Sequence, residues 1–247
     1  KKRTYGSHSY CTNGTKLAGL ERLMRKTTYP IGQRPDGERL ELTVFELEGT
    51  RPGPTAYFQA SVHGAELQGN LVIRQLANKL QQLDFAGKVV LIPLANPEGM
   101  TQKSGQYTAG RFNPVTGHNW NRNYFELFSP SNIQKHGHSV SDFCHDFFNN
   151  HSPKDKDLQK NISASFKSFQ LGALKALLSE WSKRGAKHNG LLNLTLQSLA
   201  AHADFVFDLH TGPVATRYVY APSFALEDAL HFGFPHLLEI PHEFAGA

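Results

Sequence analysis

The sequence lacks the features that would place this protein outside the class of ordinary globular domains. Only two of its 247 residues are cysteines, Cys11 and Cys144, which are too few for a disulfide framework and form no CxxC pair. No window approaches the roughly 18 uninterrupted apolar residues of a membrane span. The opening stretch, KKRTYGSHSYCTNGTK, has no apolar core behind its basic residues, so it is not typical of a secretory signal. These absences favour a reducing compartment, and we expect a cytoplasmic protein.

The charge of the chain is only moderately positive, at +5. The lysines and arginines are scattered, and no basic run is interleaved with aromatic residues as a nucleic-acid surface would need. A modest positive excess is also what a cleft for a small anionic substrate would show. We therefore expect a small anionic partner, no nucleic acid and no membrane.

The first half of the chain predicts an α/β architecture. Residues 42–49 and 55–62 are typical of strands, with the Arg-Pro-Gly-Pro of 51–54 as the turn between them. Leucine and isoleucine then recur at helical spacing over about 65–83, and the continuous apolar run of 88–96 is typical of a strand buried on both faces. This strand–helix–strand order predicts a mixed, mostly parallel sheet flanked by helices.

The second half begins with a long polar passage, about 97–165, which is too long for an ordinary connection and is expected to be functional, partly mobile, or both. Helical spacing returns at 168–185 and again at 191–202. The run 204–209 is typical of a buried strand, and 216–221 of one more.

We find no internal repeat, so residues 1–247 are expected to form a single α/β domain. The chain closes on LLEIPHEFAGA, an apolar run that enters a Gly/Ala-rich tail without a closing helix. This ending predicts a natural protein that is truncated here and continues further.

Three residues with metal-binding side chains follow predicted strands. His63 and Glu66 come after 55–62, and His210 comes after 204–209. In parallel α/β sheets the carboxyl ends of the strands share one edge, where ligands bind. Two imidazoles and one carboxylate are a ligand set of catalytic zinc. Asp208 lies on the same side of its strand as His210 and is placed to fix its tautomer.

Each of these signals is weak alone. An isolated HxxE is more often a helix start with its glutamate near the positive end of the dipole, and a lone histidine after a strand is more often structural. Their common position at strand ends favours one zinc ion held by His63, Glu66 and His210.

A second candidate site lies in GHNWNRNY, residues 117–124. Arg122 offers a planar fork suited to a carboxylate, and Asn121 can add a donor. Arg111, eleven residues before Arg122, is placed to stabilise an oxyanion. The structural alternative is a solvated loop in which Arg122 caps a backbone carbonyl and Arg111 is a surface charge.

The order HxxE, NRN and DLHTG within an α/β frame resembles the zinc carboxypeptidase superfamily. HGAE, NPEGM and DLHTG are most similar to the succinylglutamate desuccinylase/aspartoacylase family. The similarity covers roughly 40–125 and 200–245. The passage between, about 126–200, is longer than the family core requires, so we expect an insertion there.

The resemblance implies a function and a role for each matched residue. His63, Glu66 and His210 match the zinc ligands. Asn121 and Arg122 match the pair that binds the substrate carboxylate. The loosely spaced Arg111 matches the arginine that stabilises the oxyanion. The implied activity is that of a zinc-dependent deacylase, which hydrolyses the amide bond of an N-acyl amino acid or a similar small carboxylate-bearing substrate.

The glutamate that acts as the general base in the family has no clear match in this sequence. It lies on a late strand, well beyond the third zinc ligand, and only Glu227, Glu239 and Glu243 follow His210 here. Glu243, in PHEF, is the best of these, and a base beyond this sequence is favoured over it.

Two alternatives to a deacylase remain open at this point. A metallocarboxypeptidase would need the same zinc and the same Arg122. A non-catalytic binding protein would keep the cleft and lack the base.

Overall fold

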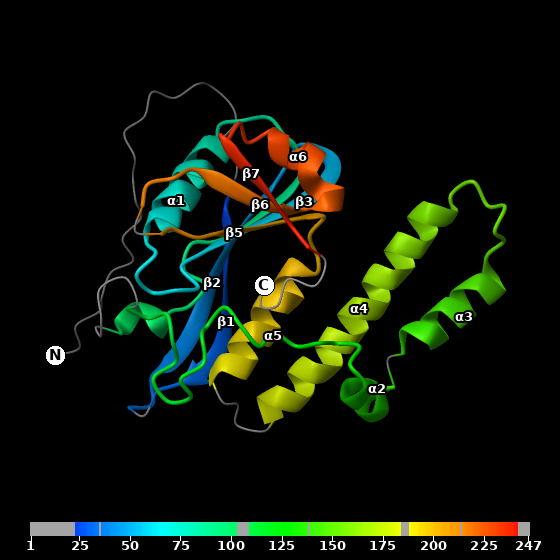
Figure 1. Ribbon diagram of the computed structural model, residues 1–247, viewed down its shortest axis with the longest axis horizontal. Coiled ribbons are helices and arrows are strands. Elements are labelled where there is room, and N and C mark those ends of the chain that lie inside the picture. Colours follow the sequence, from blue (N-terminus) through cyan, green and yellow to red (C-terminus); the bar gives the residue numbers. More distant parts are fainter. Residues whose placement is uncertain are drawn as a thin grey trace.

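The computed structural model describes residues 23–34, 36–102, 109–137, 139–183, 188–212 and 214–241. Its centre is a five-stranded sheet in the order β1-β2-β4-β3-β5, with helices on both sides (Figure 1). The strands and helices have the following bounds: β1 Arg25–Gln33, β2 Arg39–Glu48, β3 Arg51–Ala60, α1 Gln68–Leu80, β4 Ala86–Ile92, α2 Pro130–His136, α3 Val140–Asn150, α4 Leu158–Lys183, α5 His188–Ala200, β5 Phe205–Leu209, β6 Tyr218–Pro222, α6 Leu226–Leu230 and β7 His236–Ile240.

The strands that carry the candidate ligands run in the same direction. β3 pairs in parallel with β4 on one side and with β5 on the other, whereas β2 is antiparallel to both β1 and β4. Helix α1 makes the crossover between β3 and β4, which is the predicted βαβ unit. The mixed, mostly parallel sheet is thus confirmed, and the carboxyl ends of β3 and β5 lie next to each other.

The two faces of the sheet are covered by different helices. Val89 and Leu91 of β4 point to the face where Ile73 and Ala77 of α1 pack. Successive side chains of a strand alternate between faces, so Val90 and Ile92 join the opposite core, which includes residues of α5. The continuous apolar run of β4 is the consequence of its burial on both faces.

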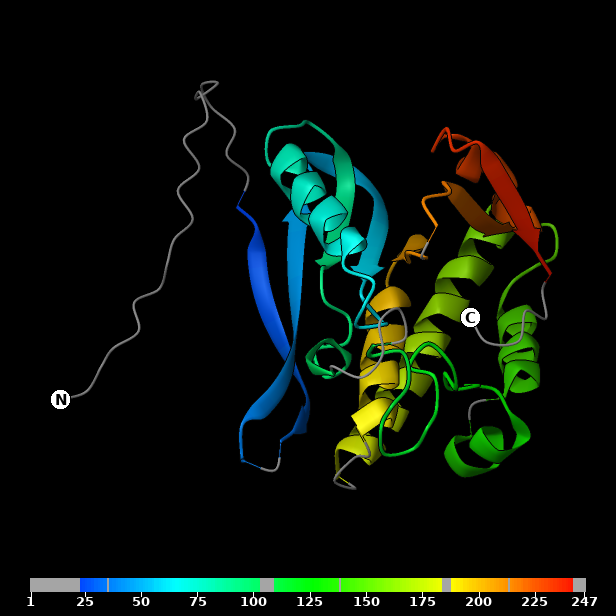
Figure 2. The ribbon, with the colours of Figure 1, turned by 60° about the vertical axis from the view of Figure 1, so that its left-hand side comes forward.

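The helices between the sheet strands divide into a packed part and an arm. Helix α5 packs against β1 and against α4. Helices α4 and α3 lie on the far side of α5 from the sheet and are called the arm below (Figure 1); Figure 2 shows α4 running close to α5. The interface of α4 with α5 and the preceding loop is formed by leucines: Leu127, Leu174, Leu177 and Leu194.

A second, smaller sheet follows β5 in the chain. β6 and β7 pair in parallel beside the short helix α6 (Figure 1). Among the described residues no helix has both the length and the apolar content that crossing a membrane requires.

The structure corrects several expected boundaries. The turn between the first pair of expected strands lies at Gly49 and Thr50, and Arg51–Pro54 belongs to β3. Helix α1 begins at Gln68, so residues 61–67 form a loop. The long polar passage contains α2, α3 and the start of α4, which were not predicted from the sequence, although Val140, Phe143 and Phe147 of α3 recur at helical spacing. The interpretation of about 126–200 as an insertion stays a prediction.

Candidate metal centre

The three candidate ligands are brought together by neighbouring strands. His63 and Glu66 lie in the loop that follows β3, and His210 follows β5 directly. Their ligand atoms all lie within 4.8 Å of one another, and His63 and Glu66 are buried. No other group of three or more His, Cys, Asp or Glu side chains within the described ranges meets this geometry.

Both histidines present the same nitrogen to the glutamate. His63 Nδ1 lies 2.9 Å from Glu66 Oε1, and His210 Nδ1 lies 2.8 Å from Glu66 Oε2. The backbone N–H of Thr211 also donates to Glu66 Oε2, at 3.1 Å. The carboxylate is therefore fixed between the two imidazole rings.

The outer nitrogens of the two rings have oxygen partners. His63 Nε2 lies 2.8 Å from Asn119 Oδ1, and His210 Nε2 lies 2.8 Å from Asp208 Oδ2. Asn119 Oδ1 also accepts the backbone N–H of Asn121, so this atom is an acceptor and His63 Nε2 carries the hydrogen. The same assignment holds for His210, because an ionised Asp208 can only accept.

This arrangement of tautomers directs two nitrogen lone pairs at one carboxylate. With hydrogen on Nε2, a neutral imidazole carries its lone pair on Nδ1, and both Nδ1 atoms face the oxygens of Glu66, so a cation among them, either a proton or a metal ion, stabilises the group. The outer oxygen partners are those that typically orient histidine ligands in metal sites. The donor set therefore fits a divalent metal such as zinc.

The pKa shifts of the ligands show what stabilises the group without a metal. Burial alone would raise the pKa of Glu66, but hydrogen bonds from His210 and His63 hold it well below its usual range. Burial would lower the pKa of His210, yet hydrogen bonds to Asp208 and Glu66 raise it to about 10. Without a metal the two carboxylates thus keep His210 protonated, so metal binding must displace that proton.

The loop that carries His63 is held by backbone contacts to two other loops. Gly64 donates its N–H to the carbonyl of Gly110, at 3.0 Å. A Cβ on Gly64 would lie 2.1 Å from the carbonyl oxygen of Gly99, and a Cβ on Gly110 would meet the same atom at the same distance. No side chain fits among these three glycines, which explains the glycines of HGAE and NPEGM.

Asn96 of NPEGM completes this junction. Its side chain is fully buried, donates to the carbonyl of Val62 at 2.9 Å and accepts the N–H of Gly99 at 2.8 Å. The segment after β4 therefore fixes the backbone immediately before His63.

Arg111 reaches the ligands because its loop folds back on itself. The N–H of Trp120 donates to the carbonyl of Arg111, and Phe112 and Asn119 form a β-bridge. Arg111 Nη1 lies 3.3 Å from Glu66 Oε1 and 3.4 Å from His63 Nδ1. The loosely spaced Arg111 thus lies beside the candidate metal ligands and is not a surface charge remote from them.

Asn121 lies beside His210 with a donor that the protein does not use there. Its Nδ2 is 3.1 Å from His210 Nε2, but the hydrogen of that nitrogen already points to Asp208. Burial and the charge of Asp208 raise the pKa of Tyr124, whose hydroxyl donates to Asn121 Oδ1 at 2.9 Å. The amide is therefore oriented with its N–H groups toward the site.

Arg122 caps a backbone carbonyl, as the alternative to a substrate-binding role predicted. Its Nη1 donates to the carbonyl of Asn121, at 2.6 Å. A guanidinium has five N–H donors, so this bond leaves others for a ligand.

Other sequence candidates lie apart from this centre. Glu227 is in α6 and Glu239 in β7, and neither is hydrogen-bonded to a candidate ligand in the described structure. Glu243 lies outside the described residues. Asn119 is the contact that the sequence interpretation missed, although it stands within the all-polar GHNWNRNY loop that drew attention to Asn121.

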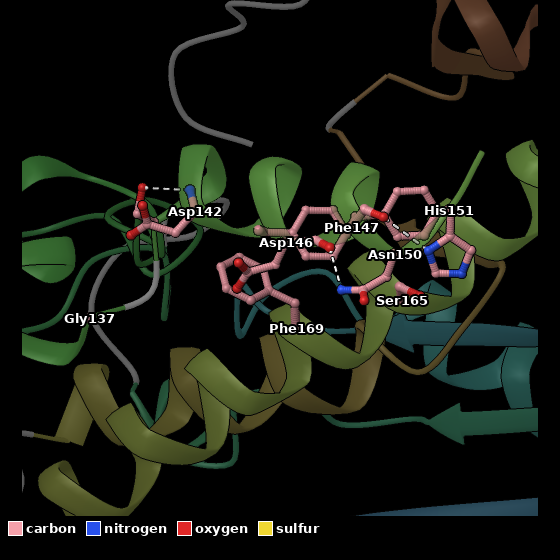
Figure 3. Close-up of a pocket in the computed structure, with 10 residues that line it drawn as sticks. Gly137, Asp142, Asp146, Phe147, Asn150, His151, Ser165 and Phe169 are labelled. Carbon is pink, nitrogen blue, oxygen red and sulfur yellow. Dashed lines mark hydrogen bonds between the residues drawn. The ribbon is translucent and has the colours of Figure 1, made fainter. Parts of the chain in front are cut away.

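A separate hollow of about 350 Å³ lies on the arm. Figure 3 shows Asp142, Asp146 and Asn150 along α3, with Phe147 beside His151 and Phe169 contributed by α4. None of these residues belongs to the metal centre, and the polar groups of the hollow are not arranged around one point.

Comparison with known proteins gives a family model and solved structures that match this chain. The sequence model of the succinylglutamate desuccinylase/aspartoacylase catalytic domain matches residues 52–245. A solved structure from Shewanella frigidimarina, described as a putative member of that family, is 33% identical with a TM-score of 0.75 and covers 93% of this chain. A second, from Shewanella amazonensis, is 38% identical with a TM-score of 0.68 and covers 90%.

The matched proteins are longer than this chain, which spans 56% of each of the two Shewanella structures. A curated protein of Halomonas elongata, N-alpha-acetyl-L-2,4-diaminobutyric acid deacetylase, is 32% identical over 72 residues, which is 29% of this chain and 19% of that protein.

Proposed function

Because the chain belongs to the succinylglutamate desuccinylase/aspartoacylase family, we propose that the protein is a zinc-dependent deacylase. Its substrate is an N-acyl amino acid or a similar small molecule with a carboxylate, and the amide bond to the acyl group is hydrolysed. The name of the Halomonas deacetylase supports an acyl amino acid as the substrate class.

One observation carries the proposal: two histidine Nδ1 atoms and a carboxylate converge within 4.8 Å at the ends of adjacent parallel strands. Such a set of three protein ligands leaves a coordination position for water or substrate, which distinguishes catalytic from structural zinc sites. Zinc, when bound, supplies a Lewis acid and a water of lowered pKa.

The remaining residues take roles that follow from their chemistry. Arg122 and Asn121 bind the substrate carboxylate through charge-assisted N–H donors. Arg111, whose guanidinium lies 3.3 Å from Glu66, stabilises the negative charge that develops on the carbonyl oxygen of the scissile amide. Asp208 and Asn119 hold the two imidazoles in the tautomer that exposes Nδ1.

Hydrolysis by the full-length protein tests the proposal. Protein stripped of metal and then reloaded with zinc is assayed on acyl amino acids, including N-acetyl-diaminobutyrate, and on peptides. Release of free amino acid from the acyl compounds, only with zinc, is the expected result. Full activity without metal would contradict it, and release from peptides alone would identify a carboxypeptidase.

Arg122→Ala tests the carboxylate site. Loss of a charge-assisted hydrogen bond should raise KM about 10- to 100-fold, or about 1.4–2.7 kcal/mol. Arg74→Ala, which removes an exposed arginine of α1, is the matched control and should leave KM unchanged. An unchanged KM in Arg122→Ala would contradict a role in substrate binding, and the hydrogen bond to the carbonyl of Asn121 would then be the only role of Arg122.

A further inference from the structure

Helix α5 directs a stripe of polar side chains at the loop that carries Asn121 and Arg122. The stripe consists of Asn189, Asn193 and Gln197, which are spaced four residues apart and therefore lie on one face of the helix. All three are hydrogen-bonded to the segment 113–125.

Gln197 holds the end of that loop with both groups of its side chain. Its Oε1 accepts the N–H of Phe125 at 3.1 Å, and its Nε2 donates to the carbonyl of Phe125 at 3.1 Å. The side chain thus pairs with Phe125 as a neighbouring strand would, and it fixes the backbone three residues after Arg122.

Asn193 acts on the residues of the site themselves. Its buried Nδ2 donates to the carbonyls of Arg122, at 3.2 Å, and of Asn123, at 3.3 Å. Asn123 has a φ of 60°, a left-handed conformation that asparagine adopts more readily than other non-glycine residues. The donor of Asn193 stabilises the carbonyl on each side of this turn. Asn189 accepts from the buried Asn113 at the other end of the loop.

Apolar contacts accompany the stripe. Trp120, which precedes Asn121, is 1% exposed and belongs to the same core cluster as Leu192 and Leu196 of α5. Its ring therefore anchors the loop from beneath while the polar stripe holds the backbone. The hydrogen bonds of the stripe and the packing of Trp120 together fix the position and the orientation of the loop relative to α5.

We infer that the stripe Asn189–Asn193–Gln197 positions Asn121 and Arg122 and thereby sets the preference of the enzyme for substrates that bear a carboxylate. This inference rests on the proposed function. The three side chains are positioning residues, since each acts through the backbone or side chains of the loop. The inference gives helix α5 a role in substrate recognition, although this helix lies within the passage predicted as an insertion.

Gln197→Met in the zinc-loaded, full-length protein tests the inference. The substitution conserves size and removes both bonds to Phe125. The assay compares an N-acyl amino acid with the same compound whose carboxylate is replaced by a primary amide. We expect an approximately tenfold higher KM for the acid, a nearly unchanged kcat, and an approximately tenfold smaller preference for the acid over the amide.

Gln170→Met, on α4 and outside the stripe, is the matched control and should leave the preference unchanged. Zinc content should equal that of the wild type in both variants. An equal loss of activity toward acid and amide, or an unchanged KM, would overturn the inference, because a merely structural defect would not select against the carboxylate.

Amide hydrogen exchange separates this inference from the proposed function. Gln197→Met and Asn193→Leu should both accelerate exchange at residues 119–125, while Gln170→Met should not. If the wild type hydrolyses no acyl amino acid, the proposed function fails, and exchange then decides the positioning role alone. Unchanged exchange at 119–125 in both variants would overturn it.

Discussion

Different interactions stabilise two regions of the molecule: the loops around the candidate metal ligands, called the metal end below, and the arm of α3 and α4. At the metal end, three loops meet through backbone atoms, with Gly64, Gly99 and Gly110 in contact and the buried Asn96 bridging two of the loops. In the arm, rings pack on rings, as Phe143 does on Phe166 and Phe169. Directional backbone contacts fix positions closely, whereas apolar packing tolerates small displacements. The candidate metal ligands therefore lie where close backbone contacts fix the position of the loops.

A single methyl group should distinguish the two regions most strongly. Gly64→Ala places a Cβ 2.1 Å from the carbonyl oxygen of Gly99, so backbone must move. We expect a loss of about 3 kcal/mol in the free energy of unfolding, together with weaker metal binding. Chemical denaturation and metal titration measure both effects.

Gly172→Ala in the arm helix α4 is the matched change. A Cβ there meets nothing within 4 Å, and alanine favours a helix interior over glycine by up to about 1 kcal/mol. The variant should be slightly more stable than the wild type. Equal destabilisation by the two substitutions would remove the contrast between the regions.

Truncation of a ring should damage the arm without reaching the metal. Phe147 is buried in the arm, stacks on His151 with ring centroids 4.1 Å apart and contacts Phe143. Phe147→Ala should lower the free energy of unfolding by about 3 kcal/mol and accelerate amide exchange in α3. Metal content and KM should be those of the wild type, and a loss of metal would show that the arm and the site are coupled.

Asp208→Asn should act on the metal alone. The amide cannot hold the hydrogen of His210 Nε2 with the charge of a carboxylate, so zinc affinity should fall about 10- to 100-fold. Competition with a chelator measures the affinity. Asp228→Asn, in α6, is a control with no predicted effect, and unchanged zinc affinity in Asp208→Asn would exclude Asp208 as the partner that orients His210.

The smallest effect is expected where the arm helix meets the sheet. The N–H of Thr55 and the ammonium of Lys167 hold the pKa of Asp204 below its usual range. A lowered pKa contributes stability that is present above pH 3.8 and is lost as the pH falls through the folded-state value. Asp204→Asn should remove this part of the acid sensitivity, by less than about 1 kcal/mol because the pair is half exposed. Unfolding of both proteins between pH 2 and 6 measures the difference, and parallel profiles would contradict it.

The sequence predicted the parts of the site that local pattern determines. The apolar runs of β3 and β5 revealed strands, but the expectation that β5 is buried is wrong, because β5 lies at the end of the sheet and its residues are exposed or half-buried. His63 and His210 follow these two strands and had to share one edge of the sheet. The polar loop 117–124 drew attention to Asn121 and Arg122, and to Arg111 before them, and the resemblance to a known family then gave each of them a role. Family membership, the mixed parallel sheet and the proximity of the three candidate ligands agree with these predictions.

What escaped prediction depends on contacts between distant segments. β1 lies at the sheet edge, and its inward-facing residues Tyr29 and Ile31 alternate with Pro30 and polar residues over too short a stretch to stand out in the sequence. The bond from His63 to Asn119 spans 56 positions, and the pairing of Phe125 with Gln197 spans 72. Asparagine and glutamine at helical spacing on α5 are typical of a solvated face, and only the fold reveals that the loop covers them.

Metal content is the most direct test of the central claim, that His63, Glu66 and His210 bind a catalytic metal. Elemental analysis is made on full-length wild type and on His210→Ala, both purified without added metal, with His145→Ala of the exposed arm surface as the control. The account predicts about one zinc per chain in the wild type and in His145→Ala, and a loss of zinc in His210→Ala. Absence of zinc from the wild type, even after incubation with excess metal, would contradict it.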